Sequence, residues 1–491
     1  MAAEQAERVY RFEPLDTSGV FLGLGLLQCV FLGGGLLASV LGLTLGMPLL
    51  AAVVPVVSGA LASFARIRGR AAWQWLPLLA SWSWMKVSRG ERWFARLPLL
   101  PAESSGASLP PALRGLRVVE IPWRGALHLG AVADEQRGTL TAVVPVSGPE
   151  FVVQPRSSQE HLLGGWAGVL NQFAVERGVV SHLAWSDTAR PSGLREHRDW
   201  LATVGSTEPH PAAAASYAGL LDEAAAVAAN HETFLTLTVA ADRLPRRAAP
   251  GADPDAGLAR SLCGAVDGLL RSVRSAGLIG GDPLDGPTLR STLRQRIDPS
   301  VARSPSGGLR AVEAAGSHPG PLALESRWRC LRADGSWHRT YWVASWPRLP
   351  VGPAWLEPFL SGGGAARTMT VIYCPVSTYR SRRRIERDLV KLDSDAQTKQ
   401  DKGRRVDARH RRATQALLDR EDELVAGYAE MTYLGLVAVS APSEEELETQ
   451  CELVEQLGRE AGLELQGLDG RQDLAWAATL PLGIAPRSLL L

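Results

Sequence analysis

Residues 20–65 read VFLGLGLLQCVFLGGGLLASVLGLTLGMPLLAAVVPVVSGALASFA and contain no charged side chain. Residues 20–45 would rise roughly 39 Å as an α-helix, and residues 47–65 also reach the length of a membrane-spanning helix. Gly46 and Pro48 lie between the two runs and favour a tight turn. The stretch therefore predicts a two-helix transmembrane hairpin, with residues 1–19 as a cytoplasmic N-terminal tail.

Basic residues beside the hairpin set its predicted orientation. The turn carries no charge, whereas Arg66, Arg68 and Arg70 follow the second run. The positive-inside rule then predicts that both termini are cytoplasmic. The expected localisation is therefore the inner (cytoplasmic) membrane, as a multi-pass protein.

Residues 66–100 are rich in tryptophan and are expected to lie at the membrane interface. Five of the chain's 15 tryptophans fall between residues 73 and 93, and indole rings favour the headgroup level. Ordinary core contacts in the following domain are the alternative. The predicted interfacial anchors are Trp73, Trp75, Trp82 and Trp84.

Small residues recur in the hairpin at i, i+4 spacing, which permits two helix backbones to approach closely. The simplest use of this pattern is packing of the two helices on each other in the membrane, and contact with another membrane subunit is the alternative. A glutamine amide in hydrocarbon would also need a partner. The predicted packing residues are Gly35, Ser39, Gly42, Gly46, Gly59, Ser63 and Gln28.

Beyond a Pro/Ser/Gly-rich linker, the pattern becomes that of a large α+β body. Strand patterns at residues 116–122, 127–133 and 139–146 precede a helix pattern at 158–177. Near the C-terminus, further strand patterns surround a long polar helix pattern at residues 377–431. This order favours a ferredoxin-like arrangement with an elongated helical arm.

The predicted fold class is therefore α+β, with an N-terminal transmembrane helical hairpin followed by cytoplasmic ferredoxin-like α+β domains with a long helical arm. Three segments are expected after the interfacial one. They are a first α+β domain at 112–243, a helix plus loop-rich middle segment at 256–330, and a C-terminal α+β domain with a long charged helix at 331–491.

The arm carries the clearest local charge. Residues 380–412 contain 13 Lys or Arg against six Asp or Glu, whereas residues 419–460 contain 12 acids against two arginines. No aromatic residue lies within 380–412 to stack on bases, so a solvated helix or a protein–protein contact between the two charge blocks is favoured over direct nucleic-acid binding. The candidate partner-contact residues are Arg382, Arg383, Arg384, Arg387, Arg404 and Arg405.

The sequence matches none of the common catalytic motifs. None of the four lysines is followed by the Ser or Thr of a P-loop, and no HExxH pattern occurs. The five cysteines are scattered without CxxC spacing. We therefore predict no catalytic residue, no cofactor, no metal site and no enzymatic activity, and a membrane-tethered sensor or enzyme with an unrecognised site is the alternative.

Short motifs are spread along most of the chain and include Val9-Tyr10-Arg11-Phe12, Arg137-Gly138-Thr139-Leu140-Thr141, Leu183-Ala184-Trp185, Tyr433-Leu434-Gly435 and Gly470-Arg471-Gln472. These motifs resemble those of the actinobacterial PrgI-like membrane proteins of type IV secretion and conjugation loci. The C-terminal portion is also similar to the non-motor N-terminal domain of conjugation traffic ATPases. The resemblance implies a non-enzymatic scaffold that docks a separate traffic ATPase and other membrane subunits and forms a homo-oligomer. A type VII-like secretion component has the same layout and is the alternative.

Overall fold

The structure is a computed structural model of the 491-residue chain. It describes residues 26–485 apart from 65, 68–69, 89, 96–108, 174–177, 192–193, 205–209, 245–253, 301–319, 402–404, 406–407 and 428–429. The predicted tail at residues 1–19, the motif at Val9–Phe12 and Arg404 lie outside the described residues, as does most of the linker.

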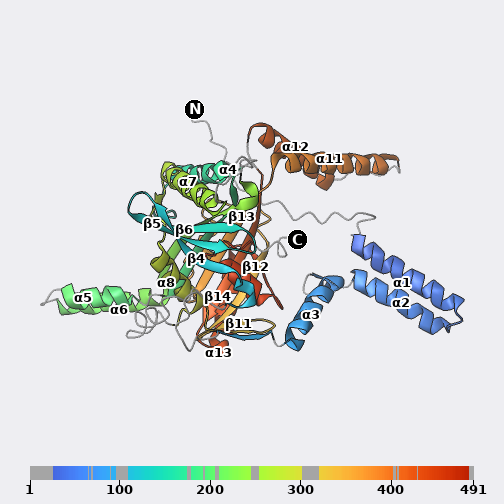
Figure 1. Ribbon diagram of the computed structural model, residues 1–491, viewed down its shortest axis with the longest axis horizontal. Helices are drawn as coiled ribbons and strands as arrows, with labels where there is room; N and C mark the ends of the chain where they lie inside the picture. The colour runs from blue at the N-terminus through green and yellow to red at the C-terminus, as the bar shows by residue number, and fades with distance from the viewer. Residues whose placement is uncertain are drawn as a thin grey trace.

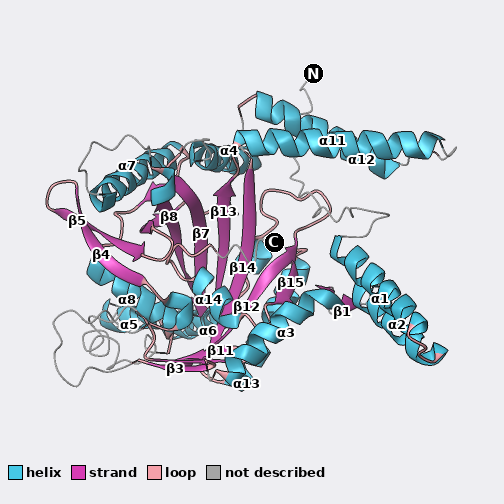
Figure 2. Ribbon diagram, turned by 45° about the vertical axis from the view of Figure 1, so that its right-hand side comes forward, coloured by secondary structure: helices cyan, strands magenta, loops and turns pink. Residues whose placement is uncertain are grey.

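One large antiparallel sheet organises the described residues (Figure 2). Its 13 strands run in the order β3-β10-β11-β12-β14-β13-β7-β8-β6-β5-β4, with β15 paired to β12 and β9 paired to β6. The strands of the first half are β4 (Leu116–Trp123), β5 (Leu127–Asp134), β6 (Thr139–Ser147), β7 (Val180–Pro191), β8 (Ala229–Ala240) and β9 (Ile279–Gly280). Those of the second half are β10 (Ala323–Ser326), β11 (Leu331–Ala333), β12 (Ser336–Ser345), β13 (Arg367–Pro375), β14 (Met431–Ala441) and β15 (Glu464–Gly467), with β3 (Arg92–Phe94) at the edge beside β10.

The two halves of the sheet repeat one topology. Each half has three strands, a helix, a strand, a helical hairpin, a strand, a helix, a short strand and a last helix. In the first half the helices are α4 (Arg156–Phe173), α5 (Arg195–Val204), α6 (Pro211–Val227), α7 (Pro254–Ser275) and α8 (Gly286–Ile297). In the second half they are α10 (Glu357–Ser361), α11 (Thr378–Asp401), α12 (Ala408–Val425), α13 (Glu444–Glu460) and α14 (Gln472–Thr479). The strand order β4-β5-β6-β8-β7 is mirrored by β10-β11-β12-β14-β13, so the body has a pseudo-two-fold arrangement.

The halves join through β7 and β13, the central strands. These strands pair antiparallel from Ala189 with Arg367 to Leu183 with Tyr373. Because neighbouring strands of both halves continue outward from this pair, the sheet has no internal edge at the junction. The Oγ1 atoms of Thr188 and Thr368 also lie 2.7 Å apart across it.

Helices cover both faces of the sheet. On one face, α4 and α7 pack over the first half and α10 and α13 over the second, around the side chains of Leu183, Leu237 and Val437. On the other face lie α8 and α14, with Ala184, Phe234 and Leu436 beneath them. Adjacent residues of one strand thus enter opposite cores, as the two-residue period of a strand requires.

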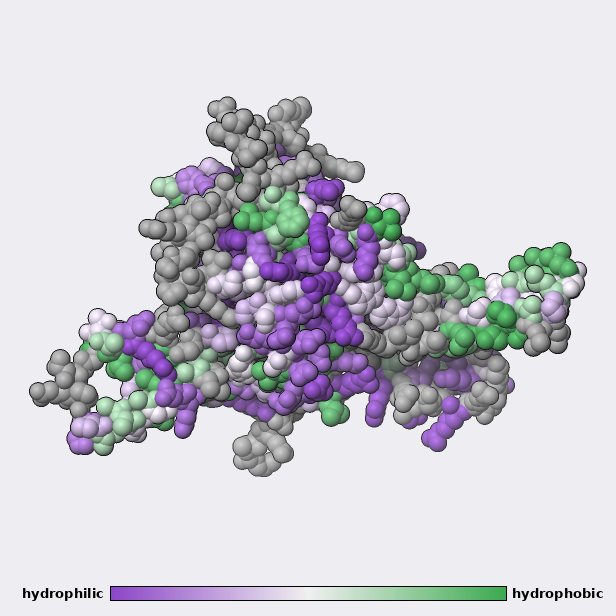
Figure 3. Space-filling view, turned by 90° about the horizontal axis from the view of Figure 1, so that it is seen from below, coloured by the Kyte–Doolittle hydropathy of each residue, from purple (hydrophilic) through white to green (hydrophobic). Residues whose placement is uncertain are grey.

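Three helical pieces extend from the body (Figure 1). The α5–α6 and α11–α12 hairpins project from opposite ends, at corresponding places in the two halves. A third hairpin, α1 (Leu26–Thr44) with α2 (Leu49–Phe64), connects to the body through β1 (Arg66–Ile67), β2 (Arg70–Ala71) and α3 (Ala72–Val87). Figure 3 shows hydrophobic surface over the α1–α2 hairpin, where Leu37, Leu45 and Val54 are exposed.

The predicted fold class and localisation are wrong in their central element, the transmembrane hairpin. In the described part of the chain, no helix is long and apolar enough to cross a membrane. Within the described residues the two runs form α1 (19 residues) and α2 (16 residues). This finding contradicts the predicted localisation as a multi-pass membrane protein. The body is also one continuous sheet instead of separate ferredoxin-like domains.

The segment after α14 crosses from the second half onto the first. Gly483 has a φ of +68°, and a Cβ at this position would lie 2.1 Å from Thr141 Oγ1. Replacing Gly483 with alanine should therefore destabilise the fold by about 2–4 kcal/mol, from left-handed strain and steric overlap together. Urea unfolding measures the change.

Gly352→Ala is the matched control, because nothing lies within 4 Å of the Cβ that it would add. We expect its unfolding free energy to stay within about 0.5 kcal/mol of the parent. Equal stabilities of the two variants would contradict the close approach at Gly483.

Candidate functional site

The hairpin residues expected to pack do so unevenly. A Cβ on Gly35 would lie 2.5 Å from the carbonyl oxygen of Pro55, and a Cβ on Gly59 would lie 2.6 Å from that of Phe31. Gln28 Nε2 donates to the Ser63 carbonyl at 2.8 Å, and Ser63 Oγ donates to the Gln28 carbonyl at 3.1 Å. Helices α1 and α2 therefore pack with little space between their backbones where the first half of α1 meets the second half of α2.

The remaining predicted packing residues have other surroundings. Ser39 is buried, and a Cβ on Gly42 would meet Met47 Sδ at 3.4 Å. Gly46 has a φ of +82°, and nothing lies within 4 Å of the Cβ that a larger residue would add. A glycine is therefore favoured here by the left-handed backbone of the turn after α1, not by helix packing.

The tryptophans of α3 lie partly against the body. Trp75 and Trp82 contact Trp328, in the turn between β10 and β11, with ring centroids 6.4 and 5.3 Å apart. Trp84 is 74 % exposed, and the side chain of Trp73 lies outside the described residues. The structure thus brings two of the four predicted anchors onto the sheet.

The arginines of the arm lie on α11, which projects into solvent. Arg382, Arg383, Arg384 and Arg387 are exposed, and so is Arg405 between the two arm helices. Arg383 lies over the ring of Tyr379, 5.5 Å from its centroid. The arm is a hairpin of two helices, α11 and α12, where the sequence predicted one long helix.

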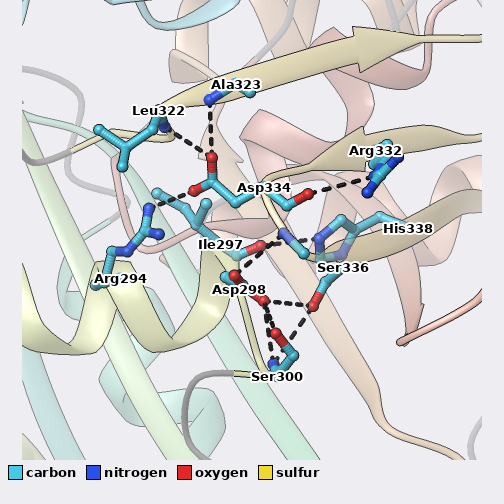
Figure 4. A network of polar contacts seen from close by, with 11 residues as sticks. Arg294, Ile297, Asp298, Ser300, Leu322, Ala323, Arg332, Asp334, Ser336 and His338 are labelled. Carbon is cyan, nitrogen blue, oxygen red and sulfur yellow. Dashed lines mark hydrogen bonds and ion pairs between the residues drawn. The ribbon is translucent and has the colours of Figure 1, made fainter. Parts of the chain in front are cut away.

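A buried polar network holds α8 of the first half against the second half (Figure 4). Asp334, in the turn between β11 and β12, accepts hydrogen bonds from the backbone N–H groups of Leu322 and Ala323 at 2.9 and 2.8 Å. Its other oxygen forms an ion pair with Arg294 of α8, and both side chains are about nine-tenths buried. One carboxylate therefore ties β10, the β11–β12 turn and α8 together.

Asp298 at the C-terminal end of α8 completes this network. Its carboxylate accepts hydrogen bonds from Ser300 Oγ at 2.5 Å, Ser336 Oγ at 2.6 Å and the Gly335 N–H at 3.2 Å. Burial alone would raise the pKa of Asp298, but these hydrogen bonds stabilise the charged form and leave its pKa below the usual value. Asp298 is therefore a fixed anion at the junction.

Two buried histidines also bridge elements that are distant in sequence. His338 Nε2 donates to the Ile297 carbonyl at 2.9 Å, and His182 Nε2 donates to the Gly483 carbonyl at 2.9 Å. Burial lowers the pKa of each to about 4, so both are neutral at pH 7. One holds the end of α8 and the other the segment after α14.

A third contact lies where β7 and β8 approach α8. Arg296 Nη2 donates to Glu232 Oε2 at 3.0 Å, and its guanidinium lies over the Phe234 ring. Burial, and then repulsion by Arg190, lower the pKa of Arg296 to about 10. The junction therefore buries several charges whose partners lie on separate elements.

Among the residues that the structure describes, no group of three His, Cys, Asp or Glu side chains could hold a metal ion.

Sequence reasoning missed this junction. Asp334-Gly335 between two apolar runs is a strong hairpin signal that could have been recognised. Asp298, His338 and Arg296 carry no local signal, because their partners come from other parts of the chain.

The family comparison points to translocon components of secretion systems. Residues 227–343 match the model of one such family, EccE, described as a putative type VII ESX secretion system translocon. No curated protein matches the chain. The matched stretch runs from the end of α6 into β12, so it contains α8 and the whole network of Asp298, Asp334 and His338.

This match corrects the predicted resemblance. The assignment to PrgI-like proteins of type IV secretion and conjugation loci is wrong, because the matching family is a type VII one. Short packing and turn motifs recur in unrelated folds and were the sole basis of that resemblance. The match supports the general prediction that the chain is a component of a secretion machine. The type VII alternative fits the match better than the type IV interpretation does.

The two buried histidines predict acid sensitivity. An unfolded histidine has a pKa near 6.5, whereas His182 and His338 have a pKa of about 4 in the fold. Between these two pKa values the unfolded state binds more protons than the folded state. The contribution of the two neutral histidines to the free energy of unfolding is therefore complete above about pH 6.5 and is lost as the pH falls towards 4. Urea unfolding should show a loss of about 2 kcal/mol per histidine between pH 7 and pH 5.

His182→Gln and His338→Gln keep a side-chain donor but remove the titration, so each should reduce this loss. His128→Gln is the control, because His128 is exposed. The same pH dependence in parent and both buried-site variants would contradict the assignment.

Proposed function

We propose that this chain is a non-catalytic structural subunit of a type VII-like secretion translocon. The observation that carries the proposal is the coincidence of the EccE match at residues 227–343 with the junction between the halves. A segment that fixes two half-sheets in one geometry is suited to presenting the projecting hairpins to other subunits. The partners are accordingly other subunits of the same machine, including its separate ATPase.

The buried polar residues at the junction are suited to a structural role and not to catalysis. Arg294, Asp298 and Asp334 are used in contacts with the chain itself. Their burial keeps these groups away from a substrate, and the hydrogen bonds of Asp298 and Asp334 restrain α8 and the β11–β12 turn. The role proposed is therefore to hold binding surfaces at a fixed separation.

Export by the host's type VII system tests the proposal. Deleting the gene should abolish secretion of that system's substrates, and the full chain should restore it. An Arg294→Ala/Asp334→Ala double variant should fail to complement, because it removes the tie between α8 and the β11–β12 turn. Affinity purification of the tagged chain should recover type VII subunits.

Arg117→Ala/Glu135→Ala is the matched control. It removes an ion pair whose side chains are 56 % and 63 % exposed, outside the matched stretch, and should complement fully. Normal type VII export in the deletion strain, or recovery of type IV conjugation subunits instead, would refute the proposal.

A further inference from the structure

Four cations form one stripe along α11. Arg380, Arg384, Arg387 and Lys391 are all exposed and recur at spacings of four, three and four residues. This spacing places them on one side of a helix over roughly 16 Å. Ser381 and Ile385, the buried residues of α11, point elsewhere. We call this set the basic α11 stripe.

Three carboxylates form a matching stripe along α13. Glu445, Glu448 and Glu452 are exposed and recur at spacings of three and four residues. The buried face of α13, which includes Leu447, Cys451 and Val454, lies on the opposite side of the helix. We call this set the acidic α13 stripe. The ion pairs near these helices use other side chains, Arg327 with Glu444 and Arg420 with Glu430.

The two stripes do not face each other within one chain. The α11–α12 arm projects from one end of the body, and α13 packs against the sheet at the other (Figures 1 and 2). Both stripes keep their exposed rows of like charge, which repel within each helix. A second molecule that offers the opposite row would relieve this repulsion at both helices.

We propose that the basic α11 stripe of one chain docks on the acidic α13 stripe of a second copy. Charge complementarity between two helical rows of similar spacing carries the inference, which is independent of the proposed function. The contact is heterologous, because the two surfaces differ, so copies join head to tail and form a ring or an open chain. Exposed ion pairs are screened by salt, so the association weakens as ionic strength rises.

The first test is sedimentation velocity of the full-length protein across a salt series. Association at about 0.05 M NaCl that weakens at about 0.5 M supports the proposal. Association through the exposed apolar side chains of the α1–α2 hairpin would not weaken with salt. A monomer at every salt concentration, or association that salt leaves unchanged, overturns the proposal.

Charge reversal gives the sharper test. Arg384→Glu/Arg387→Glu and Glu448→Arg/Glu452→Arg should each weaken self-association by at least about tenfold, because like charges then face each other. Mixing the two variants should restore association, since each supplies the surface that the other has lost. That recovery also shows that both variants are folded.

Arg411→Glu/Arg412→Glu is the matched control for the Arg384→Glu/Arg387→Glu variant, because it makes the same change of net charge at exposed positions on α12. It should leave the dissociation constant unchanged. Equal weakening by this control, or failure of the mixed variants to associate, overturns the assignment of the two stripes.

Discussion

The pairing of β7 with β13 is the interaction on which the rest of the structure depends. These strands are separated by more than a third of the chain, and their backbone hydrogen bonds convert two half-sheets into one. If they separated, each half would expose an edge strand with unpaired N–H and C=O groups, a costly and aggregation-prone surface. The mirrored strand order then places both helical hairpins, α5–α6 and α11–α12, at corresponding positions on opposite ends.

The equivalent elements carry different chemistry. Helix α6 is rich in alanine, whereas α11 and α12 are densely charged. The polar ties are also asymmetric, since α8 reaches the β11–β12 turn through Arg294 and Asp298, while the segment after α14 reaches β7 through His182. The first half therefore contacts the second through α8, and the second contacts the first through the segment after α14.

Local pattern predicted many of the elements but little of their assembly. The strand expected at residues 116–122 is β4, and the one at 139–146 falls within β6, because alternating apolar residues face a core on one side. The arm was expected as one helix, although Gly403 after Lys399 and Lys402 is a helix-stop signal that could have been recognised. The β7–β13 pairing and the junction network could not be predicted, since partners such as Arg294 and Asp334 meet through tertiary structure alone. The membrane hairpin was predicted from two uncharged runs of spanning length, whereas no helix among the described residues is long and apolar enough to cross a membrane.

The place of the family match is informative in physical terms. A surface patch tolerates substitution, whereas a buried carboxylate that orders three elements does not, because losing one partner leaves an unsatisfied charge. Asp334 and Asp298 are carboxylates of this kind, and both lie within residues 227–343. The arms lie almost wholly outside that stretch and vary in charge between the two halves. A rigid junction that carries two chemically different arms is the arrangement that the proposed scaffold role requires.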